Sequence, residues 1–105
     1  MTKAEYDDYT ARIAQFYERE NIQSLHAGEI VNDFTARRCE VCGGHPAGAR
    51  YAITGLHKPN GGTFSEYEGC TDCLYYAEYG QLDDMTMIEV AQDEQRIWEA
   101  NQNAK

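Results

Sequence analysis

The chain has 105 residues, four cysteines and a net charge of -9, which predicts one acidic domain over residues 1–105. The hydrophobic core of such a small domain is modest, so we expect a metal, a disulfide or a partner subunit to add stability. No stretch is long and apolar enough to span a bilayer, and the first residues lack the features of a signal peptide, so we expect a cytoplasmic protein without a membrane partner. Thiols are kept reduced in that compartment, so four cysteines favour a metal site over disulfides.

Residues 2–20 have the pattern of an amphipathic helix. Thr2 and Glu5 have the spacing of a capping box, in which each residue caps the other at the start of a helix. The apolar residues that recur on one face are Tyr6, Tyr9, Ile13 and Phe16. Such a face usually packs into the core of its own domain, so we expect these side chains to be buried; docking on a partner is the alternative.

The connector that follows, over residues 21–38, is less regular than the helix. The pair Ala27-Gly28 indicates a break in the chain's secondary structure. After it, three apolar residues fit either a short strand or a packed loop: Ile30, Val31 and Phe34. The helix and this connector together make up the N-terminal region, residues 1–38.

Residues 39–80 carry all four cysteines, as two Cys-x-x-Cys pairs separated by a predicted β-hairpin. The first pair, Cys39 and Cys42, is followed by glycines that favour a tight knuckle. Strand-like residues over 49–57, a turn signal over 59–62 and a return strand over 63–67 predict the hairpin. The second pair, Cys70 and Cys73, lies in the first turn of a predicted helix over residues 70–79, which ends at Gly80.

A last helix is predicted over residues 85–101. Asp84, or Thr86 paired with Glu89, is the expected N-terminal cap. The residues expected to form the apolar face of this helix are Met87, Val90, Ala91, Ile97 and Trp98. Residues 81–105 are therefore predicted to be a C-terminal helix with a frayed tail.

The two cysteine pairs are typical of a structural zinc site. Zinc in such sites takes four ligands in a tetrahedron, and all-cysteine sets are common. The second pair lies at a helix start, where free amides and the helix dipole stabilise thiolates. We therefore predict one structural Zn2+ bound by Cys39, Cys42, Cys70 and Cys73. Two disulfides or a redox dithiol are the alternatives, and the βαβ pattern expected beside a thioredoxin-like pair is missing.

The three histidines are weaker candidates for chemistry. His45 lies three residues after Cys42, but four cysteines already complete a tetrahedron. His57 is expected on the surface at the hairpin edge. His26 and Glu29 are one residue too far apart for the His-x-Glu pattern of zinc deaminases. Because a site closed by four thiolates has no open position for substrate, we predict no catalytic residues and no enzymatic activity.

The order of knuckle, hairpin and cysteine-bearing helix over residues 39–79 resembles the treble-clef and zinc-ribbon classes of four-cysteine zinc finger. This resemblance implies an α+β fold, with a treble-clef-like finger flanked by an N-terminal and a C-terminal helix. A motif string within residues 42–80 also resembles small zinc proteins associated with phages and mobile elements; its parts are Cys42-Gly43-Gly44, Ala47-Gly48-Ala49-Arg50, Thr54-Gly55 and the run Cys70 to Gly80. The second resemblance implies a phage origin and a location in the host cytoplasm.

The favoured function is a protein-binding module. Tyr75, Tyr76 and Tyr79 cluster on one short predicted helix, and aromatic residues dominate interface hot spots. Packing in a leucine-poor core is the alternative role for each of them. For a phage protein, a natural version of this function is an inhibitor of a host or defence enzyme, acting by contact or by placing acidic groups where nucleic-acid phosphates bind. An acidic surface also serves solubility alone, and pairing of the terminal helices between two copies is left open.

The charge distribution bears on the alternative, a nucleic-acid-binding finger or transcriptional regulator. Residues 1–35 have three basic residues against seven acidic, residues 36–60 have four against one, and residues 61–105 have two against ten. The basic residues of the middle segment are Arg37, Arg38, Arg50 and Lys58. Duplex binding gains affinity mainly by neutralising phosphates, so the acidic segments on both sides disfavour nucleic acid as a partner. The three arginines are therefore also candidate contacts to a protein.

Overall fold

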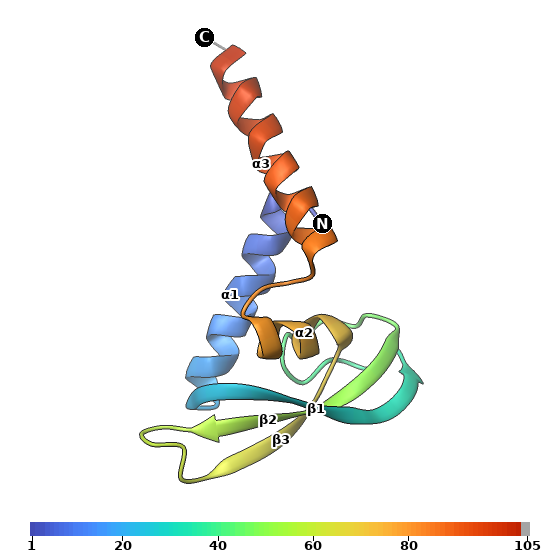
Figure 1. Cartoon of the computed structure of the whole chain (residues 1–105), viewed down its shortest axis with the longest axis vertical. Helices are drawn as coiled ribbons and strands as arrows, with labels where there is room; N and C mark the ends of the chain where they lie inside the picture. Colours follow the sequence, from blue (N-terminus) through green and yellow to red (C-terminus); the bar gives the residue numbers. More distant parts are fainter. Residues whose placement is uncertain (104–105) are drawn as a thin grey trace.

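The computed structural model of the chain describes residues 1–103. This part of the chain contains three helices and a three-stranded antiparallel sheet, which confirms the predicted α+β class. In chain order the elements are α1 (Lys3–Arg19), β1 (Ile22–Thr35), β2 (Gly48–His57), β3 (Phe64–Gly69), α2 (Thr71–Tyr79) and α3 (Asp84–Asn103). The molecule is elongated, with extents of 53 × 34 × 20 Å; the sheet forms one end and α3 projects from the other (Figure 1). No helix in residues 1–103 is both long and apolar enough to cross a membrane.

The sheet has β2 as its central strand. β1 runs antiparallel to β2 from the pair Ile22–His57 to the pair Thr35–Gly48. β3 returns along the other edge of β2, which confirms the hairpin predicted between the cysteine pairs. Helices α1 and α2 lie on one side of the sheet, and no element of residues 1–103 covers the other side (Figure 1).

Strand β1 corrects the prediction of an irregular connector with a break at Ala27-Gly28. The structure has one long strand through this segment, with a shift in its register between Ala27 and Ile30. A Cβ atom at Gly28 would lie 2.4 Å from the carbonyl oxygen of Ala52, so only glycine allows the neighbouring strand this close. The glycine therefore marks an irregularity within a strand rather than the end of one.

The core fills the space between α1, α2 and the inner side of the sheet. From α1 it takes Tyr9, Ile13 and Phe16, which confirms three of the four residues of the predicted buried stripe; the fourth, Tyr6, is half-buried against the core. Phe16 is fully buried, and its ring packs edge-on against that of Tyr67 with the ring centroids 4.8 Å apart. At Gly69 an added Cβ would lie 2.3 Å from Cδ1 of Ile53, which shows how closely β3 approaches the core.

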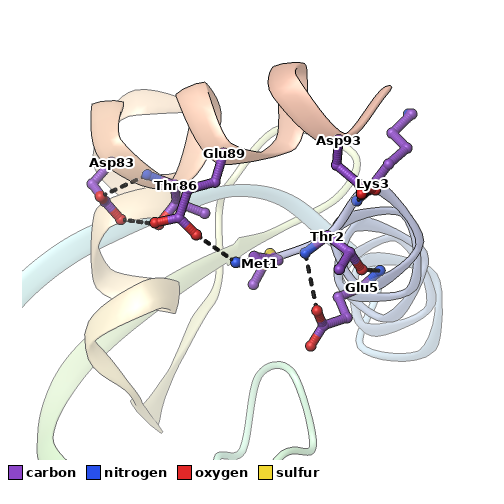
Figure 2. Close-up of polar contacts among 8 residues, drawn as sticks. All are labelled: Met1, Thr2, Lys3, Glu5, Asp83, Thr86, Glu89 and Asp93. Atoms are coloured by element: carbon purple, nitrogen blue, oxygen red, sulfur yellow. Dashed lines mark hydrogen bonds and ion pairs between the residues drawn. The ribbon is translucent and has the colours of Figure 1, made fainter. Parts of the chain in front are cut away.

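The first turns of α1 and α3 are held by side-chain caps. In the predicted capping box, the hydroxyl of Thr2 accepts from the backbone N–H of Glu5 at 3.1 Å, and the Glu5 carboxylate accepts from the Thr2 N–H at 2.9 Å (Figure 2). The predicted N-terminal cap of α3, Asp84 or Thr86 with Glu89, was wrong, because the capping carboxylate belongs to Asp83. That carboxylate accepts from the backbone N–H of Thr86 at 3.1 Å and from its hydroxyl at 2.7 Å.

Helix α3 is held only through its first half. Val90 is buried, and the backbone N–H of Lys3 donates to the Asp93 carboxylate at 2.9 Å, beside the start of α1 (Figure 2). Every residue from 94 to 103 is exposed, including Ile97 at 42% and Trp98 at 57%. The part of the predicted apolar face formed by Ile97 and Trp98 is therefore uncovered, because α1 begins at the level of Asp93 and does not extend beside them.

Candidate metal centre

Four cysteines from two separate segments converge on one point. Cys39 and Cys42 come from the knuckle after β1, and Cys70 and Cys73 come from the start of α2; their four sulfur atoms all lie within 4.8 Å of one another. The Cys39 and Cys73 sulfurs are 3.7 Å apart, and those of Cys42 and Cys70 are 4.0 Å apart. Four sulfurs bound tetrahedrally at the usual zinc–sulfur distance lie about 3.8 Å apart. The cluster therefore has the dimensions of a four-cysteine metal site.

The thiols are free and buried. None of the four cysteines, all within the described residues, forms a disulfide. Each has less than a tenth of its surface exposed. The alternative of two disulfides is therefore not the arrangement in this structure, in which the sulfurs face a common centre without bonding to each other.

The knuckle is shaped by its own backbone. The Cys39 N–H donates to the Gly44 carbonyl at 2.7 Å, and the Gly43 N–H donates back to the Cys39 carbonyl at 2.9 Å. Gly43 has φ = 76°, a left-handed conformation that favours glycine over any residue with a Cβ. These two bonds close the turn and bring Cys39 and Cys42 to the same side, as the Cys-x-x-Cys spacing predicted.

The second pair is positioned by the start of α2. Cys70 is the N-cap residue, just before the helix rather than within its first turn as predicted, and Cys73 lies in that turn. The Cys70 backbone N–H donates to the Cys39 sulfur at 3.3 Å, so a hydrogen bond links the two pairs. At the other end, Gly80 has φ = 74° and its N–H donates to the Tyr76 carbonyl at 2.8 Å, which confirms the predicted C-terminal cap.

Tyr9 is a contributor to the site that the sequence did not reveal. Its hydroxyl donates to the Cys73 sulfur at 3.3 Å. Burial, followed by the negative charge of Cys73, raises the pKa of Tyr9 far above its ordinary value, so the hydroxyl remains a donor. The available signal was the position of Tyr9 on a buried helical stripe, because a buried tyrosine hydroxyl needs a partner.

The electrostatics of the cluster favour binding of a cation. Hydrogen bonds from the neighbouring thiols of Cys42, Cys70 and Cys73 stabilise the thiolate of Cys39 and so lower its pKa. Cys39, Cys42, Cys70 and Cys73 would hold a divalent metal, which would replace the remaining thiol protons and neutralise part of the charge that four thiolates would bring together. With these four ligands, a tetrahedral ion would have its ligand positions filled by protein.

None of the three histidines belongs to the cluster, which contains cysteines alone. His26 contacts Ser24 on the exposed surface of β1. His57, predicted on the surface, is half-buried instead. Its ring contacts the carbonyl oxygen of Glu20 through Nδ1 and the hydroxyl of Ser65 through Nε2, each at 2.9 Å. It thereby joins the end of α1 to β3.

The three tyrosines predicted to contact a partner divide between the core and the surface. Tyr76 is half-buried and packs edge-on against Tyr9, with the ring centroids 5.7 Å apart. Tyr79 is mostly exposed and lies against Tyr75, with the ring centroids 4.5 Å apart. Tyr79 is therefore open to contact, Tyr75 is half-buried beside it, and Tyr76 has the packing role that the sequence left as its alternative.

The predicted partner contact at Arg50 is corrected by its burial, since only 2% of its surface is exposed. Its guanidinium donates to three main-chain carbonyls: those of Arg37 at 2.5 Å, Pro46 at 2.8 Å and Ala49 at 3.1 Å. These acceptors lie on both sides of the knuckle. The sequence alone does not predict that Arg50 contacts them, because their positions along the chain form no recognisable pattern. Arg37 and Arg38 remain exposed.

Comparisons of the chain with family models, with curated proteins and with solved structures find no match in any of the three. The metal centre is therefore assigned from its own geometry, in which four buried thiols lie at the separations of a tetrahedral ligand set.

Proposed function

We propose that the chain is a zinc-stabilised protein-binding module without catalytic activity, and that its finger belongs to the treble-clef class. The observation that carries the proposal is the convergence of four buried thiols within 4.8 Å. Zinc is the common metal of structural four-cysteine sites, although iron also binds four thiolates. The metal would fix the knuckle against the start of α2.

The size of the core supports a structural role for the metal. Within residues 1–103, only nine aliphatic or aromatic side chains are buried besides the cysteines. Each contributes about 1.5–3 kcal/mol, which is opposed by the conformational entropy of ordering the chain. A metal bound only by the folded chain adds its binding free energy to folding, so it supplies stability that this core lacks.

The surface supports binding of another protein. Several large apolar side chains are more than half exposed, a feature that often marks interaction sites: Val31, Phe34, Phe64, Tyr79, Met85, Ile88 and Trp98. The net charge of -9 favours a basic partner and fast, salt-sensitive association. Inhibition of a host or defence enzyme is the version of this function favoured by the resemblance of residues 42–80 to phage zinc proteins.

The positions of the basic residues weigh against the nucleic-acid alternative. Arg50 is buried, while Arg37 and Lys58 lie near opposite ends of β2. A ten-residue strand is roughly 30 Å long, so these cations do not form one patch.

Metal analysis of the purified full-length chain tests the proposal. We expect one zinc per chain, and after exchange for cobalt we expect the intense thiolate-to-cobalt absorption and visible bands of a tetrahedral site. The Cys42→Ser variant should change both spectra. A chain that is fully ordered with neither zinc nor iron bound would contradict the proposal.

A further inference from the structure

The side of the sheet that faces away from α1 and α2 is open to solvent (Figure 1). Alternation along β3 places Phe64, Glu66 and Glu68 on this side, and all three are exposed. Their partners across β2 share the same side: Leu56, Thr54 and Ala52. We call these six residues the open sheet face. It combines an apolar end, at Phe64 and Leu56, with an acidic end.

The acidic end contains a hollow. It has a volume of about 470 Å³ and is lined by Val31, Glu40, Ala52, Glu66, Tyr67 and Glu68. The Glu40 carboxylate is held in place, because it accepts from the Glu68 backbone N–H at 2.6 Å. None of the ion pairs within residues 1–103 involves Glu40, Glu66 or Glu68. Three carboxylates thus line a partly apolar hollow that has no lysine or arginine in its lining, and Arg38 lies in the neighbouring hollow that also contacts Glu40.

The negative charge of the open sheet face determines which kind of partner can bind to it. A second copy of the chain would bring two sets of carboxylates together, and such charges are costly to bury without counter-charges. A lysine or arginine from another protein fits the same hollow. Its aliphatic stem can lie on Val31 and Ala52 while its charged end lies among the three glutamates.

We infer that the open sheet face docks a basic segment of another protein, with a lysine or arginine in the hollow and an apolar side chain against Phe64. This inference rests on the proposed protein-binding function and specifies the surface and the chemistry of the partner.

A titration followed by NMR tests where such a segment binds. The probe is a short synthetic peptide of alternating lysine and leucine, added to the zinc-loaded, isotope-labelled full chain; a glutamate–leucine peptide is the control. We expect saturable shifts at Thr54, Glu66 and Glu68 with the lysine peptide alone, weakening as salt is added. Shifts confined to α2 or α3 would overturn the choice of surface while leaving a protein-binding module in place. No binding at low salt would overturn the inference, whereas zinc content would still test the scaffold separately.

Two double variants separate a specific surface from general charge attraction. Glu66→Gln with Glu68→Gln removes two carboxylates from the hollow, and Glu94→Gln with Glu99→Gln removes two from the exposed half of α3. Both leave the same net charge. We expect the first to weaken peptide binding about tenfold and the second less than about twofold. Equal losses would overturn the inference.

Discussion

The two ends of the molecule differ in what holds them. At one end, β2, β3, the knuckle and α2 meet around four buried sulfurs and share a core with α1. At the other, α3 continues from residue 94 to residue 103 with no side chain covered by another element. Both ends have regular secondary structure, so regularity alone does not indicate where stability lies. The anchored end should unfold as a unit, whereas the projecting half of α3 should fray independently.

Loss of the metal centre should have the largest effect, and only on the anchored end. Cys39→Ser or Cys73→Ser, or zinc removal by a chelator, should abolish cooperative unfolding of the sheet and α2, because structural zinc contributes on the order of 10–16 kcal/mol in small fingers. Thermal denaturation followed by circular dichroism would show it. Gln23→Ala, on the exposed surface of β1, is the control. Cysteine variants that melt like the unchanged protein would contradict a structural role for these residues.

Proline substitution should separate the two ends by position. Proline within a helix costs about 3 kcal/mol or more. Leu74→Pro removes the hydrogen bond from its N–H to the Cys70 carbonyl and would displace the second cysteine pair, so we expect loss of the fold. Gln95→Pro should reduce helical content while leaving the melting temperature nearly unchanged. The comparison fails if both variants melt alike.

Truncation of an aromatic side chain gives a smaller contrast. Phe16→Ala should cost about 3–5 kcal/mol, because its ring is fully buried and leaves a cavity against Tyr67. Trp98→Ala should change the free energy of unfolding by less than about 0.5 kcal/mol, since Trp98 is mostly exposed. Urea denaturation of the zinc-loaded variants measures both. A large loss from Trp98→Ala would show that α3 is covered in solution.

The smallest predicted effect concerns the hydrogen bond to a sulfur. Tyr9→Phe keeps the buried ring but removes the donor to Cys73, so we expect a loss of about 1 kcal/mol in stability. The readout specific to this bond is metal retention, with faster zinc transfer to a competing chelator. Tyr17→Phe, on the same helix, is the matched control and should retain zinc like the unchanged chain. Equal transfer rates in both variants would exclude a role for Tyr9 at the site.

Local features were predictable from the sequence and longer-range ones were not. The Thr2–Glu5 cap, most of the α1 stripe and the convergence of the cysteine pairs each depend on spacings within a few residues, and these were found as predicted. The length of β1 was missed, and only a short strand after Gly28 was considered, because the register shift near Gly28 interrupts the alternation that identifies a strand. The exposure of Ile97 depends on where α1 begins in space, which no local pattern encodes.

Arginine and tyrosine positions show the same limit. Arg50 was predicted to contact a partner, yet it is buried. Its guanidinium donates to three carbonyls that come together only in the folded chain. Tyr76 was equally ambiguous, since its packing depends on the angle between α1 and α2. The residue type thus limited the possible roles of Arg50 and Tyr76, but the packing of the folded chain determines which role each one has.

The buried guanidinium of Arg50 has a consequence for metal binding. Its bonds to Arg37 and Pro46 close the loop that carries the first cysteine pair. The loop around Cys39 and Cys42 therefore has its shape from contacts within the chain. An incoming metal would meet a preorganised pair of ligands, which would lower the entropy cost of binding.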